Sequence, residues 1–173
     1  IIFEDARVPA SALLGGDEGQ GFYTAMKVLD RGRLHLSSVS TGISERIIAE
    51  ALSYAAERKQ FGTPIGEFQL VQAMLADSQA ELFAGKAMTL DAAKKYDRKE
   101  EIAMLAACCK MFTTEAAGRI ADRAVQIHGG SGYMAEYKVE RFYRDVRLLR
   151  LYEGTTQIQQ LVIARNMLKS LAN

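Results

Sequence analysis

The sequence predicts an all-α protein that folds as an up-and-down four-helix bundle. Long segments carry apolar residues at steps of three and four, which is the spacing of one face of an α-helix. Only two prolines occur in 173 residues, Pro9 and Pro64, so most of the chain is free to be helical. Most of its glycines lie in short stretches before or between these segments. Long amphipathic helices joined by short connectors are typical of a helix bundle.

The first 14 residues stand apart from this pattern. The segment Ile1–Pro9 reads as a short strand, with the sequence IIFEDARVP. A lone strand has nothing to pair with, so we expect residues 1–14 to be a terminal strand and linker from a missing β domain, and residues 15–173 to be the helical domain. The glycine-rich stretch Gly15–Gly21 lacks the Lys-Ser/Thr of a phosphate loop and is interpreted as a linker and helix start.

The first helix is expected at residues 19–58. Its length suggests that it spans the bundle or extends beyond it. Its apolar stripe also contains a charged residue, Arg33. The stripe consists of Phe22, Met26, Leu29, Arg33, Leu36, Ile43, Ile47 and Tyr54.

Breakers at Gly62, Pro64 and Gly66 separate this helix from a second one, expected at residues 67–96 with Phe68, Val71, Leu75 and Leu82 in line. A third helix is expected at 99–128, where the glycines after His128 stop it. A short segment follows at 139–149, and a last helix is expected at 156–171, with Ile158, Leu161, Val162 and Leu168 on one face. The stripe of the third helix consists of Ile102, Leu105, Cys109, Phe112, Ala116, Ile120, Ala124 and Ile127.

Composition excludes several classes of function. Basic residues number 22 and acidic residues 21, a net charge of +1, so no basic surface for nucleic acid is expected. No apolar run approaches the roughly 18 residues of a membrane span. The adjacent Cys108 and Cys109 match no zinc site and are expected to be reduced, as in the cytosol. The two histidines, His35 and His128, lie far apart, so no metal site is expected.

Two places on the first helix depart from plain bundle logic. Arg33 lies in the apolar stripe, where a cation must pair or bind something. A local ion pair with Asp30, three residues earlier, also explains the position of Arg33, and it is the favoured explanation from position alone. Arg58 and Lys59 lie at a helix C-terminus, where the helix dipole favours cations. Arginine also binds phosphate in a bidentate manner, so the residues alone leave both readings open.

Two further places lie later in the chain. The sequence QIHGGSG at 126–132 is either a helix cap or a nest of backbone N–H groups that receives an anion. On its own, His128 is better explained as a packing or capping residue than as a ligand or base. In the sequence YEGTTQ at 152–157, Thr155 or Thr156 could cap the last helix, and Glu153 could simply favour the helix dipole.

Taken together, these pieces resemble the acyl-CoA dehydrogenase family. The sequence ERKQFG at 57–62, then PIG at 64–66 and FQ at 68–69, is similar to the flavin-contacting segment of that family. The sequence QIHGGSGY at 126–133 resembles its glycine loop, and RD at 144–145 followed by LYEGTTQIQ at 151–159 resembles its catalytic segment. The resemblance runs from about Phe3 to Leu168.

The resemblance implies an architecture and a reaction. Family members have an N-terminal helical domain, a middle β domain and a C-terminal four-helix bundle, and they are usually homotetramers with FAD between subunits. The present chain would be the C-terminal bundle of an enzyme that converts an acyl-CoA to a trans-2-enoyl-CoA, with electron-transfer flavoprotein as a possible acceptor. The implied compartment is the cytoplasm, or the mitochondrial matrix in a eukaryote.

The resemblance also implies residue roles. Glu153 is the expected catalytic base, and Gly154 is expected to line the acyl site. Asp30, Arg33 and Arg165 are expected to contact the CoA moiety. The expected FAD contacts are Arg58, Lys59, Gln60 and Phe61 on the FAD of a neighbouring subunit, Phe68 and Gln69 beside it, Gln126, Ile127, His128, Gly129 and Gly130 through backbone and amide groups, and Thr155, Thr156 and Gln157 near the active site.

One branch of the family places its base on the first helix, just before the arginine that corresponds to Arg33. That position is Gly32 here, which cannot act as a base. The assignment of the base to Glu153 is therefore internally consistent.

Three alternatives remain at the level of sequence. An acyl-CoA oxidase would share the base and reoxidise its flavin with O₂. A flavin monooxygenase on the same fold would have no use for Glu153 or the CoA-facing arginines. A non-enzymatic helical oligomerisation module is the third. The isolated segment is expected to be inactive, because the main flavin cradle belongs to the missing domain.

Overall fold

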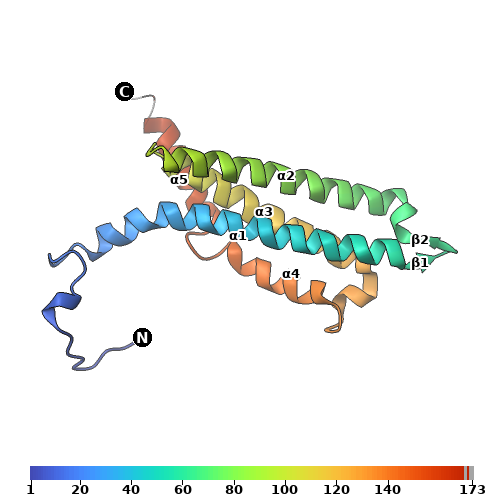
Figure 1. Cartoon of the computed structure of the whole chain (residues 1–173), viewed down its shortest axis with the longest axis horizontal. Helices are drawn as coiled ribbons and strands as arrows, with labels where there is room; N and C mark the ends of the chain where they lie inside the picture. Colours follow the sequence, from blue (N-terminus) through green and yellow to red (C-terminus); the bar gives the residue numbers. More distant parts are fainter. Residues whose placement is uncertain (170, 172–173) are drawn as a thin grey trace.

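The computed structural model describes residues 1–169 and 171, and it is almost entirely helical (Figure 1). Two very short strands form an antiparallel hairpin in which Lys59 pairs with Pro64 and Gln60 with Thr63. In chain order the elements are η1 (Ala10–Ala12), α1 (Gly21–Glu57), β1 (Lys59–Gln60), β2 (Thr63–Pro64), η2 (Ile65–Glu67), α2 (Gln69–Asp97), α3 (Ala103–His128), η3 (Gly129–Tyr133), α4 (Lys138–Leu149) and α5 (Thr156–Lys169).

The helices run up and down along one long axis. Helices α1, α2 and α3 pack against one another, and α4 returns along α1 and α3 on the side away from α2 (Figure 1). Helix α3 is central, because it contacts α1, α2, α4 and α5. The hairpin lies at one end of the bundle, and α5 lies near the other end. The predicted all-α bundle is confirmed, and the short segment expected at 139–149 forms a further helix, α4.

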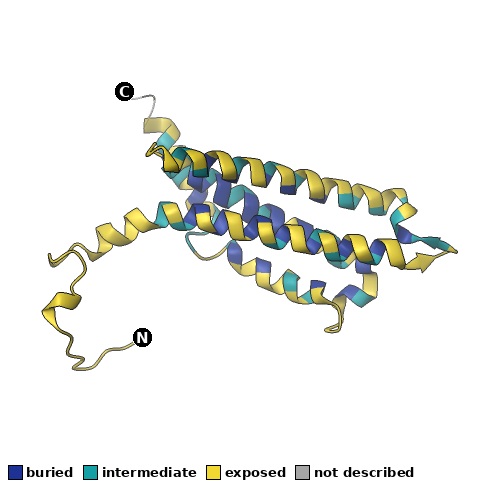
Figure 2. Ribbon diagram, viewed as in Figure 1, coloured by how far each residue is buried: buried dark blue, intermediate teal, exposed yellow. Residues whose placement is uncertain are grey.

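Small residues allow the central helices to approach closely. The contact between α1 and α3 is rich in buried alanines, among them Ala51, Ala55, Ala117 and Ala121, with Ile47 and Ile120 beside them. Every predicted stripe residue of α3 is buried or partly buried. Figure 2 shows the buried residues gathered along the inner faces of the helices and the exposed ones along their outer faces.

Buried hydroxyls on α1 satisfy themselves within the helix. Ser37, Ser40 and Ser44 are almost fully buried, and each donates a hydrogen bond of 2.8 Å to the carbonyl four residues earlier. This local bond removes the cost of an unpaired polar group in the core. The small polar residues therefore act as space-saving core residues between the helices.

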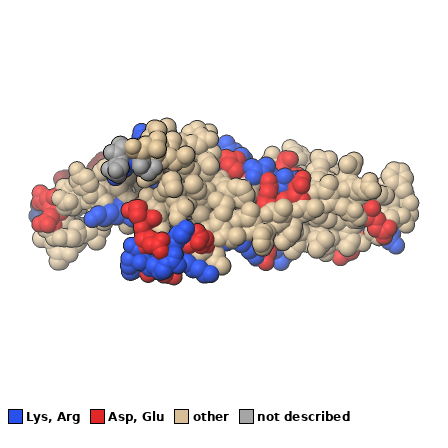
Figure 3. Space-filling view, turned by 90° about the horizontal axis from the view of Figure 1, so that it is seen from above, with Lys and Arg blue, Asp and Glu red and all other residues tan. Residues whose placement is uncertain are grey.

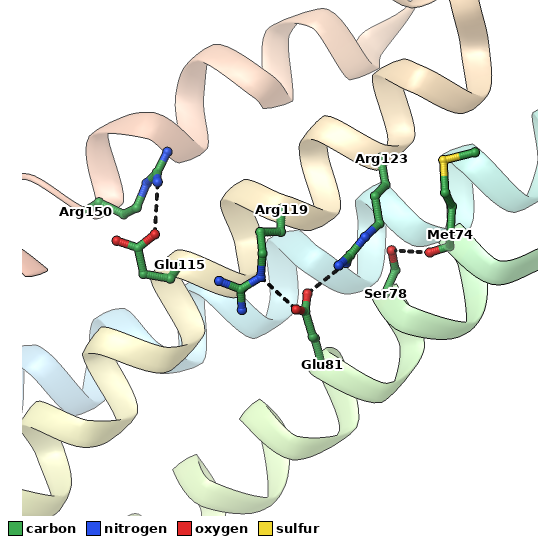
Figure 4. A network of polar contacts seen from close by, with 7 residues as sticks. All are labelled: Met74, Ser78, Glu81, Glu115, Arg119, Arg123 and Arg150. Carbon is green, nitrogen blue, oxygen red and sulfur yellow. Dashed lines mark hydrogen bonds and ion pairs between the residues drawn. The ribbon is translucent and has the colours of Figure 1, made fainter. Parts of the chain in front are cut away.

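A charged clamp joins α2 to α3. Glu81 accepts hydrogen bonds from Arg119 at 2.7 Å and Arg123 at 2.8 Å (Figure 4). Burial raises the pKa of the Glu81 carboxyl, but these two guanidinium groups outweigh burial and hold it below its usual value. On the face shown in Figure 3, Lys and Arg lie beside Asp and Glu, so positive charge does not form a continuous surface there.

Some sequence-based expectations were wrong. Ile1–Pro9 forms no strand and is fully exposed, because a strand needs a partner for its backbone groups and the described chain offers none. Phe22 and Met26 are exposed, because the start of α1 extends beyond the other helices. Hairpin β1–β2 was not predicted and occupies the segment expected to be a simple connector.

The last helix also differs from expectation. Its predicted apolar face is largely exposed at Ile158, Leu161 and Leu168, whereas Gln159 is fully buried. Helix α5 ends at Lys169, and the predicted extension to residue 171 includes residue 170, which lies outside the described residues. The buried face of α5 is shifted by one residue from the predicted face, because the side chain of Gln159 donates hydrogen bonds to backbone carbonyls in the interior.

Candidate active site

Glu153 lies in a strained turn between α4 and α5. Its φ is 57°, and the φ of Gly154 is 86°, so both residues adopt the left-handed conformation. That conformation is unfavourable for a non-glycine residue and persists only where the surroundings enforce it. Gly154 has a second constraint, because a Cβ there would lie 2.7 Å from Nε2 of Gln159. The turn therefore requires glycine at 154 for both conformation and space.

Two buried side chains hold the turn from the interior of the protein. Lys110 Nζ donates to the Gly154 carbonyl at 2.7 Å. Gln159 Nε2 donates to the same carbonyl at 3.0 Å and to the Glu153 carbonyl at 3.1 Å. Lys110 comes from the middle of α3 and Gln159 from the first turn of α5, and both are completely buried. The two consecutive carbonyls thus point into the protein toward donors that cannot move freely.

The start of α5 is fixed by a second set of contacts. Thr155 caps the helix, because its Oγ1 accepts a hydrogen bond from the Ile158 N–H at 3.4 Å. The Thr156 hydroxyl donates to Glu115 at 2.7 Å. Arg150 Nη1 donates to the other oxygen of Glu115 at 2.9 Å, as Figure 4 shows. Glu115 on α3 therefore holds both ends of the turn that carries Glu153.

These contacts hold the pKa of the Glu115 carboxyl below its usual value. Burial raises the pKa of its carboxyl, but the hydrogen bonds from Thr156 and Arg150 outweigh burial and lower it. Gly118 makes room for the arginine, since a Cβ there would lie 3.3 Å from the Arg150 guanidinium. The carboxylate of Glu115 is thus a structural charge that ties α3 to the turn.

The carboxylate of Glu153 lies against α1. A Cβ on Gly32 would lie 2.5 Å from Glu153 Oε2, so the absence of a side chain at 32 leaves the place that the carboxylate fills. Glu153 Oε2 is buried and has no hydrogen-bond partner within the described chain. A buried carboxylate oxygen without a donor is poorly solvated, and its lone pairs are free to interact with a bound molecule.

Arg33 follows Gly32 and belongs to the same region. It is 8% exposed and donates from Nη1 to Asp30 at 2.8 Å, while its Nε has no partner within the described residues. The expected local ion pair is therefore present, and it leaves the buried Nε donor of the guanidinium unused. Arg165 is exposed on α5, on the same outer face as Ile158. The structure thus brings Arg33 next to the Gly32–Glu153 contact.

A second cluster of expected residues lies at the other end of the bundle. An open pocket of about 430 Å³ brings together the end of α1, the hairpin and the loop after α3. A Cβ on Gly129 or Gly130 would meet nothing within 4 Å, so this wall of the pocket is exposed backbone. The lining consists of Tyr54, Arg58, Gln60, Ile65, Ile127, His128, Gly129, Gly130 and Ser131.

His128 is a packed residue within this pocket wall. Its ring stacks on Tyr54 with centroids 4.1 Å apart, and its Nδ1 lies 2.8 Å from the Ala124 carbonyl, which accepts a hydrogen bond. Burial lowers the pKa of His128 below its usual value, although the Ala124 carbonyl and Glu50 oppose the shift. The packing interpretation is confirmed, and the neutral ring fixes the shape of the loop.

The remaining expected flavin contacts surround this pocket without lining it. Phe61 at the hairpin tip has a φ of 52° and is 96% exposed, and its ring meets Phe68 edge-on with centroids 6.3 Å apart. Lys59, Gln69 and Gln126 are exposed. Phe61 and Phe68 thus form an aromatic pair beside the pocket, of which Phe61 is exposed.

The two clusters are far apart in one chain. Twenty-six residues, nearly all in α1, separate Gly32 from Arg58, which at about 1.5 Å per residue is about 39 Å. Thr155, Thr156 and Gln157 lie beside Glu153, whereas Arg58, Gln60 and the glycine loop lie at the hairpin end. The residues expected to contact one cofactor therefore form two separate groups.

Sequence reasoning missed three residues that build the site. These are Lys110, Glu115 and Gln159. A signal for the first two was present, because residues 103–118 of α3 contain no other charged residue. A charged residue within an otherwise uncharged stretch is a candidate for burial, and a buried charge needs a partner. Gln159 carried no such signal, since it lies among other polar residues.

Two kinds of site are absent from the described part of the chain. No group of three or more His, Cys, Asp or Glu side chains is placed to hold a metal ion. Among the described helices, none has the length and apolar character needed to cross a membrane. Both cysteines are free, and burial, with a smaller contribution from Cys108, raises the pKa of the Cys109 thiol to about 11. That thiol is therefore protonated at neutral pH.

Comparisons with known proteins agree with this arrangement. A family model described as acyl-CoA dehydrogenase, C-terminal domain, matches residues 19–168. The caffeyl-CoA reductase-Etf complex subunit CarC of Acetobacterium woodii is 46% identical over 169 residues, which cover 98% of this chain and 44% of that protein. The probable acyl-CoA dehydrogenase YngJ of Bacillus subtilis is 47% identical with the same coverage.

A solved structure shows the same fold. Butyryl-CoA dehydrogenase from Megasphaera elsdenii superposes with a TM-score of 0.92 at 38% sequence identity, and the match covers 96% of this chain and 43% of that one. The chain thus spans less than half the length of these relatives. The family match at residues 19–168 includes both clusters described above.

Proposed function

Because the chain belongs to the acyl-CoA dehydrogenase family, as its C-terminal helical domain, we propose that the intact protein oxidises an acyl-CoA thioester to a trans-2-enoyl-CoA. The observation that carries this proposal is the Glu153 carboxylate, held in a strained turn with a buried oxygen that has no partner in the described chain. Such a group is suited to remove a proton from carbon, which needs a fixed and poorly solvated base.

The chain supplies the proton-transfer half of the reaction. Glu153 takes the proton from the α-carbon of the thioester. FAD, when bound, supplies the acceptor for the hydride that leaves the β-carbon. The Glu153 N–H has no hydrogen-bond partner within the described chain. We propose that it donates to the thioester oxygen and stabilises the enolate that develops there.

The turn geometry supports this donor role. Lys110 and Gln159 bind the carbonyls of Glu153 and Gly154, which belong to the two peptide groups that follow the Glu153 N–H, and so restrain the turn around this donor. A fixed donor requires no reorganisation when charge develops on the thioester oxygen. Gly154 adds no side chain where the acyl chain would pass. On the other side, Arg33 and Asp30 are proposed to contact the CoA moiety, together with Arg165 from α5.

The second cluster fits a dinucleotide cofactor. Arg58 offers a planar cation suited to a pyrophosphate, Gln60 an amide, and Gly129 and Gly130 exposed backbone. We therefore propose that Arg58, Lys59, Gln60, Phe61, Phe68, Gln69 and the segment 126–130 bind FAD. The second group of FAD contacts, Thr155, Thr156 and Gln157, is proposed to act at the active-site end.

The separation of the two clusters supports a shared cofactor. About 39 Å is longer than an extended FAD molecule, so one FAD cannot contact both clusters of the same chain. We propose that the hairpin end of one subunit contacts the FAD whose active site belongs to another subunit. The exposed Phe61 at the hairpin tip supports this arrangement, since contact with a second subunit would bury it. The assembly would be a homo-oligomer, in this family usually a tetramer.

A second candidate is the same reaction in the reverse direction. The relative CarC is named a caffeyl-CoA reductase that forms a complex with Etf. The proton acceptor of dehydrogenation is the proton donor of reduction, because both directions pass through the same transition state. Electron-transfer flavoprotein is accordingly proposed as the redox partner in either direction. A cytoplasmic or mitochondrial-matrix location is also proposed, consistent with two free cysteines.

Anaerobic spectroscopy of the intact flavoprotein tests the proposal. We expect the oxidised flavin to bleach on addition of at least one straight, branched or aryl acyl-CoA, and the reduced flavin to reoxidise on addition of the matching enoyl-CoA. Rapid oxygen consumption with acyl-CoA alone would identify the oxidase instead. Failure of every acyl-CoA and enoyl-CoA to change the flavin spectrum would overturn the proposal and favour a non-enzymatic bundle.

A further inference from the structure

Lys110 is a buried lysine beside the turn that carries the proposed base. It is 0% exposed and lies in the middle of α3, between the buried residues Cys109 and Thr113 on the same helix. Its Nζ reaches the Gly154 carbonyl at 2.7 Å, directly after the proposed base. A buried ammonium group is unfavourable unless it is paired or hydrogen-bonded. A lysine that only filled space would be replaced at lower cost by an apolar side chain.

The charges around Lys110 explain how it remains inside. Burial lowers the pKa of Lys110 below its usual value, and Arg33 on α1 acts in the same direction, whereas Glu115 on α3 and Glu153 in the turn oppose the shift. Glu115 already accepts hydrogen bonds from Arg150 and Thr156. Glu153 Oε2 has no donor within the described chain. Glu153 is therefore the nearby carboxylate whose charge Lys110 is left to balance.

We propose that Lys110 is a positioning residue for proton transfer, which fixes the Glu153–Gly154 turn and stabilises the ionised form of the Glu153 carboxylate. The inference rests on the proposed function, since it assigns Lys110 a part in the same reaction. Gln159 holds the same turn through the same carbonyl, but its amide is neutral. A comparison of Lys110 with Gln159 separates the effect of anchoring the turn from the effect of charge, because both side chains anchor the turn and only Lys110 is charged.

Three variants of the intact holoenzyme test the proposal. Lys110→Met keeps the length of the side chain and removes its charge, and Gln159→Met removes the neutral anchor. Lys86→Met is the control, because Lys86 lies on the surface of α2 and pairs with the exposed Glu45. The measurement is the rate of anaerobic flavin reduction by acyl-CoA across a range of pH, with acyl-CoA affinity measured separately.

We expect Lys110→Met to slow flavin reduction by about tenfold or more and to leave acyl-CoA affinity largely unchanged. The pH profile of the rate should be displaced in Lys110→Met, because a positive charge near the proposed base is lost. Gln159→Met should slow the reaction without this displacement, and Lys86→Met should change neither. An unchanged pH profile in Lys110→Met would overturn the electrostatic role.

Hydrogen–deuterium exchange tests the anchoring role independently of catalysis. Amides of residues 151–157 should exchange faster in Lys110→Met, whereas those of the hairpin at 59–64 should be unchanged. Unaltered exchange at 151–157 would overturn the anchoring role. Lys110→Gln, neutral but polar, is the second variant if Lys110→Met does not accumulate as folded protein. If none of the acyl-CoAs reduces the flavin of the unmodified enzyme, the proposed function fails. Hydrogen–deuterium exchange still decides in that case whether Lys110 anchors the turn.

Discussion

The carboxylate of Glu153 fills the space that a side chain on Gly32 would occupy. The distance from Oε2 to an ideal Cβ at residue 32 is 2.5 Å, shorter than any stable contact between such atoms. A side chain at 32 and a carboxylate in its present place at 153 therefore exclude each other. In the related branch whose base lies just before the corresponding arginine, the base would project from α1 toward this same point. Two distant sequence positions thus serve one place in space.

The first prediction follows from that contact. Gly32→Ala should displace the Glu153 carboxylate and slow flavin reduction by about tenfold or more, because small displacements of a catalytic group are costly. Gly42→Ala on the same helix is the control, since a Cβ there meets nothing within 4 Å. The control should stabilise the protein by about 0.5–1 kcal/mol and leave the rate unchanged. Equal rates in both variants would show that the space at residue 32 is not needed.

The second prediction concerns Glu115. Glu115→Gln should lower the free energy of unfolding by about 1–3 kcal/mol, because it weakens the charge-assisted bond to Arg150 that ties α3 to the turn. Glu140→Gln is the control, since Glu140 pairs with Arg144, one helical turn further along α4, whose side chain is exposed. The control should change the free energy of unfolding little, because water screens an exposed ion pair. Denaturant unfolding monitored by circular dichroism measures both, and equal losses would contradict the assigned role of Glu115.

The third prediction concerns cofactor retention. Arg58→Ala in the intact enzyme should weaken FAD binding by roughly ten- to hundredfold, the loss of one charge-assisted contact worth about 1.5–3 kcal/mol. Acyl-CoA affinity should change little. Arg98→Ala, at the exposed end of α2, is the matched control and should retain FAD. If flavin content after dialysis is the same for both variants, Arg58 is only a charge at a helix end.

The fourth prediction concerns pH and His128. Its pKa is lowered by burial, so the folded state binds a proton less readily than the unfolded state, whose value is near 6.5. The stability that His128 contributes is complete above about pH 6.5 and falls as the pH drops below it. His128→Gln should flatten this decrease. Thermal unfolding at several pH values between 7.5 and 5 measures the effect, and a variant with the same pH dependence as the unmodified protein would exclude His128 as its source.

Helix positions were predictable because their physics is local. The stripe of α3 from Ile102 to Ile127 is buried or partly buried throughout, as its spacing predicts. The expected pairing of Arg33 with Asp30 and the helix cap at Thr155 were also within reach of short-range rules. The glycine loop and the ERKQFG segment come together in one pocket, as their joint resemblance to a flavin site suggested.

The remaining features depend on contacts between distant segments. The buried face of α5 centres on Gln159, because the carbonyls of Glu153 and Gly154 need donors, and no periodicity in α5 reveals that need. The burial of Lys110 has the same cause. The strand expected at Ile1–Pro9 does not form, because strand formation requires a partner that the described chain lacks. Positions around the strained turn were thus the hardest to predict.

Anaerobic stopped-flow reduction of the flavin in Glu153→Gln is the most direct test of the central claim. The substitution keeps the size of the side chain and leaves FAD and acyl-CoA binding intact, but the amide cannot accept the α-proton. Because a positioned general base contributes about 10²–10⁴ in rate, flavin bleaching by acyl-CoA should slow by at least about a hundredfold. Gly32 offers no replacement base, and Glu45→Gln, on the exposed side of α1, should react at the unmodified rate. Bleaching of Glu153→Gln within a few-fold of the unmodified rate would place the base elsewhere and contradict the account.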